Sequence, residues 1–266
     1  LVARWGSDVE VELSTPVKKI RWDGMMVEAE TLRGTVRGKR IIITVSTGVL
    51  AFGNIEFEPE LPSAYQQAFF DLPMGMLTKI PIEISGTRLG LKPFEDFLIE
   101  QPARHDLYFL CFPFDLDLMV GFVGGDFAWE LSVAGEAAAR DFAVDRLAVI
   151  FGNYVRVKVG RSAMTNWGAE PSVRGAYAAA RPGKAGARDV LAEPVHERIY
   201  FAGEALGGSL IQTCAGARIS GETVARAARH LYADGRRRMI IANRSVDRAR
   251  ELAAEFHGFA IGLDEI

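Results

Sequence analysis

Cysteine and histidine are scarce in this sequence of 266 residues, and their scarcity excludes several kinds of site. Only two cysteines are present, Cys111 and Cys214, and neither belongs to a C-x-x-C pair. A disulfide framework needs a set of suitably spaced cysteines, and a structural zinc site needs a group of convergent ligands. The four histidines lie far apart in the sequence. We therefore expect neither disulfides nor a bound metal.

Long apolar runs and an excess of basic charge are also missing. No run approaches the ~18–20 apolar residues that a membrane-spanning helix requires. The opening residues LVARWGSD lack the apolar core of a secretory signal peptide. The formal net charge is −3, without the basic excess typical of proteins that bind nucleic acid. These absences predict a soluble, cytoplasmic protein that binds neither a membrane nor nucleic acid.

The sequence does contain enough apolar residues for one large or two moderate domains. Hydrophobic residues make up 49% of the chain, and a chain of this length can bury a sizeable core. Alternation in residues 107–112 and 118–122 predicts antiparallel strands. The β-branched run 40–45 predicts a buried strand, and the apolar spacing in residues 137–151 predicts a helix.

The most informative stretch is rich in glycine and covers residues 198–222. A short apolar strand, residues 199–202, leads into Gly203 and Glu204, and a helix of small residues begins at Thr213 after a glycine-rich loop. A helix N-terminus presents unpaired N–H groups and the positive end of a dipole, which attract anions. Glycines let a flat ring system or a phosphate approach the backbone. The pattern fits a site for such a ligand, and it also fits an ordinary strand-loop-helix crossover with tightly packed glycines.

The residues of this stretch resemble a known signature. FAGEA at 201–205, followed by QTCAGARISGE at 212–222, resembles the C-terminal signature of the flavin-containing amine oxidase family, which includes the monoamine and polyamine oxidases. Further segments resemble the family in the same order along the chain: IIITVSTGVL (41–50), IEFEPELP (55–62), GMLTKI (75–80) and NWGAEPSVRGAY (166–177).

The resemblance implies an α/β fold in which an incomplete FAD-binding, Rossmann-like domain carries an inserted α+β substrate domain with a mixed sheet. Residues 1–46 would be the middle part of the FAD-binding domain, and residues 164–221 its C-terminal part. Residues 47–163 would form the substrate-binding domain. Residues 222–266 remain as a Rossmann-like helix-strand-helix segment.

Three residues become candidates for catalysis through this resemblance. Lys79 follows GMLT, where family members use a lysine to hold a water against flavin N5. Tyr177 stands where they place an aromatic wall facing the flavin, and Trp167 matches a neighbouring aromatic residue. The same residues also allow plainer roles. A lysine at a strand edge can extend its aliphatic stem along the surface, and both aromatics can belong to the core.

Five residues would contact the cofactor by the same resemblance. Gly203 would allow its close approach, and Glu204 would contact a hydroxyl of the ribityl chain. The backbone near Val17 would meet the adenine. Gln212 and Thr213 would lie at the start of the helix that faces the flavin.

Departures from the family pattern shape the expected cofactor binding. Ala176 replaces the cysteine that links the flavin in covalent monoamine oxidases, and Thr213 replaces their second cage tyrosine. The opening strand with G-x-G-x-x-G, which grips the pyrophosphate, does not occur. The resemblance thus implies non-covalent FAD and an incomplete aromatic cage, with primary amines, polyamines and amino acids open as substrates. We expect an enzyme truncated at its N-terminus.

The C-terminal segment resembles a different family. From Gly221 onward, the sequence GETVARAARHLYADGRRRMIIANRSVDRARELAAEF is similar to the NADPH-binding domain of glutamyl-tRNA reductase. In that family Asn243, Arg244 and Ser245 would face the ribose and 2′-phosphate of NADP, for which arginine is chemically suited. The arginines also fit a solvated basic tail. We hypothesise that two coding sequences are joined near Gly221, by natural fusion or by an artefact.

Three hypotheses about function follow. The first is an FAD-dependent oxidoreductase of amine oxidase type. It would oxidise the C–N bond of a small-molecule amine by hydride transfer to flavin N5, with O2 as acceptor and an imine and H2O2 as products. The second is an NADP-dependent, glutamyl-tRNA reductase-like segment of tetrapyrrole synthesis, fused to an inactive amine oxidase remnant. The third is a folded remnant without activity, because neither nucleotide site is complete.

Overall fold

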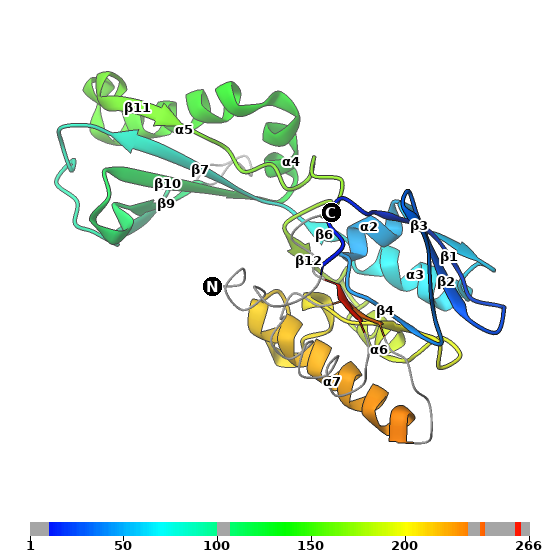
Figure 1. Ribbon diagram of the computed structural model, residues 1–266. Coiled ribbons are helices and arrows are strands. Elements are labelled where there is room, and N and C mark those ends of the chain that lie inside the picture. Colours follow the sequence, from blue (N-terminus) through cyan, green and yellow to red (C-terminus); the bar gives the residue numbers. More distant parts are fainter. Residues whose placement is uncertain (1–10, 100–106, 234–239, 243–258, 262–266) are drawn as a thin grey trace. The chain divides into compact units, whose positions relative to one another are not determined.

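The computed structural model of the protein describes residues 11–99, 107–233, 240–242 and 259–261 (Figure 1). The chain divides into two compact units. Unit 1 combines Leu1–Met74 with Tyr177–Ile266, and unit 2 is the continuous segment Gly75–Ala176. Residues 47–74, which the sequence assigns to the substrate domain, lie in unit 1. Residues 164–176, which it assigns to the FAD-binding domain, lie in unit 2.

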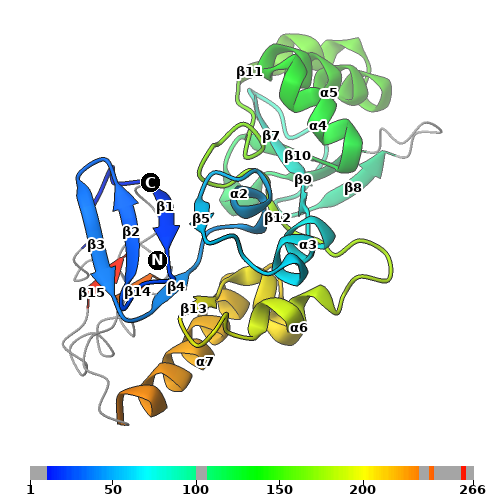
Figure 2. The ribbon, with the colours of Figure 1, turned by 90° about the vertical axis from the view of Figure 1, so that its right-hand side faces the viewer.

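An antiparallel meander opens unit 1. Its strands are β1 (Val17–Arg21), β2 (Val27–Thr31) and β3 (Gly34–Gly38), and β5 (Glu56–Glu58) pairs with β1 in parallel. The strands lie side by side in the order β3-β2-β1-β5 (Figure 2). Because strand residues point alternately to opposite faces, Ile20, Val27 and Ala29 are buried on one face. Ion pairs such as Lys19–Glu56 cover the other face.

A pair of buried parallel strands and three short helices form another part of unit 1. β4 (Ile41–Ile43) pairs with β13 (Ile199–Phe201). Both strands are apolar throughout, as expected for strands covered on both faces. They share a core with the helices α2 (Thr47–Ala51), α3 (Ser63–Asp71) and α6 (Ala187–Ala192). Where the chain passes between the units, β6 (Met74–Gly75) pairs with β12 (Tyr177–Ala178).

Unit 2 is an antiparallel sheet with two helices on one face (Figure 1). Its strands lie in the order β11-β7-β10-β9-β8. The elements are β7 (Leu77–Ile84), β8 (Asp96–Ile99), β9 (Leu107–Cys111), η1 (Pro113–Asp115), β10 (Leu118–Gly124), α4 (Gly125–Ala134), α5 (Glu136–Phe151), η2 (Asn153–Lys158) and β11 (Val159–Ser162). Ile80, Phe109 and Leu147 have no exposed surface in this core. The strands predicted at 107–112 and 118–122 and the helix predicted at 137–151 are confirmed as β9, β10 and α5.

The long helix α7 (Cys214–Ala233) follows the glycine-rich loop. After it, β14 (Ile240–Ala242) and β15 (Phe259–Ile261) pair in parallel. The predicted α/β class is therefore confirmed, in a mixed form. The second helix expected in the C-terminal segment lies outside the described residues. In the described ranges, no helix has both the length and the hydropathy needed to cross a bilayer.

Candidate functional site

The glycine-rich loop joins β13 to α7 through two short helical turns, η3 (Glu204–Leu206) and η4 (Gly208–Leu210). Gly203, which precedes these turns, has a φ of +148°, a conformation that residues with side chains rarely adopt. Its N–H donates to Ser220 Oγ at 3.2 Å, and Ser220 is only 5% exposed. A buried hydroxyl of α7 therefore anchors the turn that follows β13.

Two further glycines let the loop pack directly on the helix backbone. A Cβ added to Gly207 would lie 2.6 Å from the Cα of Gly216, and a Cβ on Gly216 would collide with the carbonyl oxygen of Leu210. Gly208 differs, because a Cβ there would meet nothing within 4 Å. Tight packing, one of the two explanations that the sequence leaves open, thus accounts for Gly207 and Gly216.

The start of α7 is exposed and suits an electron-rich group. Thr213 caps the helix, because its Oγ1 accepts the N–H of Gly216 at 3.0 Å and donates to the Leu210 carbonyl at 2.7 Å. Cys214 and Ala215, the first residues of α7, are exposed. The backbone N–H groups in the first turn of a helix have no acceptor within the helix. Together with the positive end of the helix dipole, they can bind an anion or the electron-rich edge of a ring. These residues fit a flavin, with the Thr213 hydroxyl serving the helix cap.

Two residues predicted to contact the cofactor meet at the backbone of Ala178. The Ala178 N–H donates to Glu204 Oε1 at 2.9 Å, and the Ala178 carbonyl accepts from Gln212 Nε2 at 2.9 Å. The Gln212 N–H donates to the Glu204 carbonyl at 3.2 Å. Ala178 follows Tyr177 on β12. Glu204 and Gln212 therefore lie beside the backbone that carries a predicted catalytic residue.

In unit 2, Lys79 lies on β7 with its side chain exposed. The alternation of the strand buries Thr78 and Ile80 and turns Lys79 to the other face. The Lys79 ammonium lies 5.8 Å from the ring centroid of Phe122, its partner on β10, within the range of a cation–π interaction. The Lys79 N–H donates to Thr165 Oγ1 at 2.9 Å, and the Lys79 carbonyl accepts the Thr165 N–H at 3.0 Å.

Trp167 lies two residues beyond Thr165 and is 47% exposed. Its carbonyl accepts the N–H of Gly175 at 3.0 Å, which closes the loop before β12. This exposure disfavours the alternative of a core tryptophan. Lys79 and Trp167 are thus connected within unit 2 through the segment that contains Thr165, a residue that no sequence pattern indicated.

The remaining residues predicted to contact a cofactor do not belong to the groups described above. Val17 begins β1 and packs, half-buried, against the core of unit 1. Asn243, Arg244 and Ser245 lie outside the described residues, so their contact with NADP stays a prediction.

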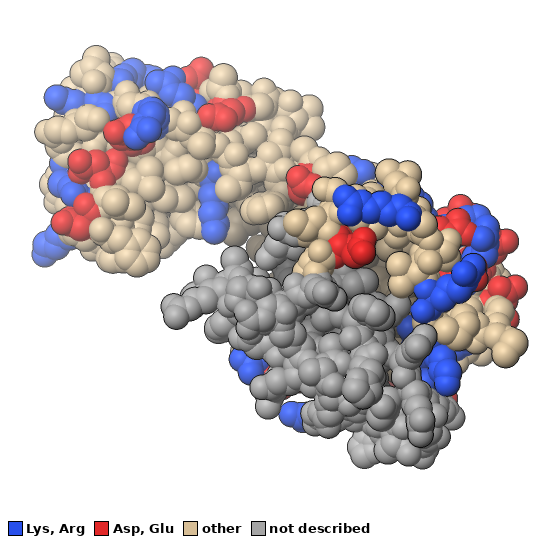
Figure 3. Space-filling model, viewed as in Figure 1, with Lys and Arg blue, Asp and Glu red and all other residues tan. Residues whose placement is uncertain are grey.

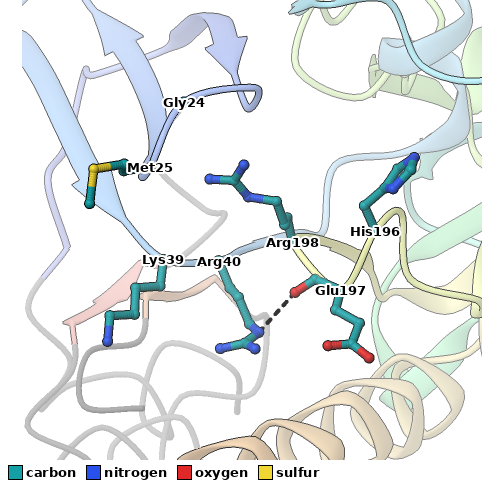
Figure 4. Close-up of a pocket in the computed structure, with 7 residues that line it drawn as sticks. All are labelled: Gly24, Met25, Lys39, Arg40, His196, Glu197 and Arg198. Atoms are coloured by element: carbon teal, nitrogen blue, oxygen red, sulfur yellow. Dashed lines mark hydrogen bonds between the residues drawn. The ribbon is translucent and has the colours of Figure 1, made fainter.

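An open pocket of about 430 Å³ lies where β4 and β13 begin, at the strand ends opposite the glycine-rich loop (Figure 4). Its lining residues are Gly24, Met25, Lys39, Arg40, His196, Glu197 and Arg198. Arg40 Nε donates to the Glu197 carbonyl at 2.8 Å. Sequence reasoning did not find this pocket. Its basic side chains point in different directions in Figure 4. On the face seen in Figure 3, charges of both signs are mixed over the described residues.

Comparison with known proteins tests the resemblance carried by the motifs. The family model of flavin-containing amine oxidoreductases matches residues 3–229. The chain belongs to this family. Membership implies a flavin cofactor, and it confirms the resemblance seen in the glycine-rich loop and in the segments that precede it.

Curated relatives of this chain include lysine-specific histone demethylases. Identity to lysine-specific histone demethylase 1 homolog 1 of Oryza sativa subsp. japonica is 29%, over 94% of this chain and 30% of that protein. Identity to lysine-specific histone demethylase 2 of Homo sapiens is 22%, over 83% of this chain and 28% of that protein. The chain therefore spans less than a third of the length of these relatives.

A second match begins inside the first. The family model of shikimate/quinate 5-dehydrogenases matches residues 216–266. The glutamyl-tRNA reductase of Hahella chejuensis (strain KCTC 2396) is 62% identical over 47 residues, which are 18% of this chain and 11% of that protein. The two family matches overlap within α7. In a dinucleotide-binding domain, the glycines that contact the phosphates lie at the turn between a strand and a helix. Gly221, where the resemblance to the reductase begins, lies inside α7 instead.

Proposed function

We propose that this chain carries part of the flavin and substrate sites of an FAD-dependent oxidoreductase that oxidises the C–N bond of an amine. The observation that carries the proposal is the family match over residues 3–229, joined to an exposed helix start behind the glycine-rich loop. Because the chain spans less than a third of its curated relatives, the activity of the whole enzyme belongs to the proposal.

In this proposal, unit 1 holds FAD without a covalent bond. Gly203 would allow close approach, the helix start after Thr213 would face the electron-rich edge of the ring, and the backbone of Val17 would meet the adenine. Ala176 offers no thiol for a covalent link. The chemistry that FAD supplies when bound is acceptance at N5 of a hydride equivalent from the carbon beside the amine nitrogen, with O2 as the final acceptor and an imine and H2O2 as products.

The chain's own residues orient the reactants. Tyr177 presents an aromatic face to the amine, which binds in its neutral form. The Lys79 ammonium, placed over the Phe122 ring, would hold a water by a hydrogen bond, and its charge would favour the negative charge that O2 acquires on reduction. The exposed Trp167 would add apolar contact surface. Such orientation contributes to the rate by keeping the reacting atoms in a productive geometry.

The names of the relatives suggest which amine to test first. They are lysine-specific histone demethylases, and a methylated lysine side chain is a secondary or tertiary amine. We propose N-methylated lysine as the first candidate, with polyamines, primary amines and amino acids as the alternatives. A cytoplasmic location stays a prediction.

Anaerobic titration of the flavin-loaded chain tests the function. With FAD in excess, we expect the flavin band near ~450 nm to bleach when the substrate amine is added. Lys79→Met should slow reoxidation by O2 more than it slows bleaching, whereas Lys92→Met, an exposed lysine of the same unit, should change neither. Absence of bleaching with all four amine classes would contradict the proposal.

A second candidate rests on the 62% identity to a glutamyl-tRNA reductase over 47 residues. An NADP-dependent segment would bind NADPH without flavin, which a fluorescence titration of NADPH detects. The position of Gly221 inside α7 disfavours it, because no phosphate-binding turn forms there. A chain that binds neither FAD nor NADPH would be the inactive remnant.

A further inference from the structure

We propose that Glu204 and Gln212 are positioning residues: they hold the Ala178 peptide between them and thereby fix the orientation of Tyr177. This rests on the proposed function, in which Tyr177 faces the amine. It adds to Glu204 and Gln212 a role beyond the cofactor contact that the family signature implies.

The buried peptide groups of Ala178 require hydrogen-bond partners. Ala178 has no exposed surface, and a buried peptide group without hydrogen bonds is unfavourable. Strand β12 is only two residues long. The next residue, Ala179, donates its N–H to the Pro73 carbonyl at 2.8 Å, whereas Ala178 is satisfied by the side chains of Glu204 and Gln212 on both its N–H and its carbonyl.

These hydrogen bonds also restrain Tyr177, the residue before Ala178 on β12. The N–H that Glu204 binds belongs to the peptide unit between Tyr177 and Ala178, and a peptide unit is planar. Holding the plane of this unit therefore restricts ψ of Tyr177. The Gln212 amide restrains the next peptide unit along the chain. Together the two hydrogen bonds restrict the backbone conformation on both sides of Ala178. They thereby restrict the direction in which the Tyr177 side chain projects from the strand.

Glu204 and Gln212 are themselves held in place by the glycine-rich loop. Glu204 follows Gly203, which is anchored to Ser220 of α7. Gln212 has a φ of +67°, unusual for a residue with a side chain and sustained only where the surroundings determine it. Its N–H is bound to the Glu204 carbonyl. The loop that forms the start of α7 therefore also sets the backbone of Tyr177.

Hydrogen exchange at the Ala178 amide tests the contact without any cofactor. Glu204→Ala removes the acceptor, and we expect exchange at Ala178 to accelerate at least about tenfold, the effect of losing a buried hydrogen bond. Glu204→Gln keeps a carbonyl oxygen at the same reach, so it should restore most of the protection. Unchanged exchange in Glu204→Ala would overturn the proposal.

Amine turnover by the flavin-loaded chain tests the positioning role. Gln212→Met removes the amide donor, and Gln66→Met is the matched control, because Gln66 Nε2 donates to the Leu61 carbonyl at 2.7 Å in the same unit. We expect Gln212→Met to lower kcat several-fold with little change in KM, and Gln66→Met to change neither. Equal losses of kcat in the two variants would show that the hydrogen bond from Gln212 to Ala178 contributes only to stability. That result would overturn the proposal.

Failure of the two proposals can be told apart. A wild-type chain that bleaches with no amine overturns the proposed function. Two comparisons of the wild type with Glu204→Ala still decide whether Glu204 holds the peptide. They are the exchange rate of the Ala178 amide and the backbone amide resonance of Tyr177.

Discussion

In unit 2, apolar side chains fill the space between a sheet and two helices, and Ile80, Phe109 and Met119 lose all their exposed surface there. In the glycine-rich loop of unit 1, the backbone itself fills the space, because Gly207 and Gly216 bring the loop against α7. Unit 2 thus depends on the volume of its side chains, whereas the loop depends on the absence of side chains and on single hydrogen bonds. Substitutions that remove or add volume should separate the two cases.

Removing volume from unit 2 should have the largest effect. Phe109→Ala leaves a cavity in the core of unit 2, and we expect a loss of about 3–5 kcal/mol in the free energy of unfolding. Leu110→Ala, its half-buried neighbour on the opposite face, should cost clearly less. Urea unfolding read by hydrogen exchange within unit 2 measures both, and equal costs would contradict the side-chain packing described for this sheet.

Adding volume to the loop should cost less. Gly216→Ala forces the new methyl against the Leu210 carbonyl, and we expect a loss of about 1–3 kcal/mol from strain. Gly24→Ala is the control, because its Cβ would lie 3.7 Å from the Met26 carbonyl oxygen, an ordinary contact. A thermal melt compares the variants, and a neutral Gly216→Ala would show that the loop can move away from α7.

Removing one hydrogen bond from the loop should have a smaller effect. Ser220→Ala takes the acceptor from the Gly203 N–H, and we expect a loss of about 1 kcal/mol. Thr223→Ala, also on α7, removes an exposed hydroxyl that donates to the Ile219 carbonyl, and it should cost less. Faster exchange at the Gly203 amide in Ser220→Ala alone is the expected signature, and equal exchange in both variants would count against the anchor.

The two cysteines should differ clearly in reactivity. Burial raises the pKa of the Cys111 thiol to about 11, while Cys214 is exposed at the start of α7. A thiol reagent at pH 8 should label Cys214 in the folded chain and reach Cys111 only after unfolding. Labelling of Cys111 in folded Cys214→Ser would contradict its burial.

The same shift predicts how stability depends on pH. The pKa of Cys111 is higher in the folded chain than its ordinary value of 9.0. Above pH 9 the unfolded chain therefore releases a proton that the folded chain keeps, so the contribution of this group to stability falls as the pH rises toward 11. The free energy of unfolding of Cys111→Ala and of the wild type, compared between pH 8 and pH 11 where the fold persists, isolates the contribution of this thiol.

Local patterns predicted secondary structure where neighbouring residues decide it. The alternation in residues 107–112 and the apolar spacing in 137–151 correspond to β9 and α5, and the β-branched run 40–45 contains β4. The compact units, however, divide after Met74 and after Ala176. Helices α2 and α3 share a core with β13, which lies far along the chain, and no local pattern records such a contact.

The family and the helix that follows the glycine-rich loop were determined by the sequence alone, because both depend on residue types at defined spacings. The tertiary structure decided what the polar side chains bind. Glu204 reaches the Ala178 N–H, and Thr165 pairs with the backbone of Lys79. These bonds join residues that are distant in sequence, so they exist only once the packed strands and helices have brought their donors and acceptors within about 3 Å.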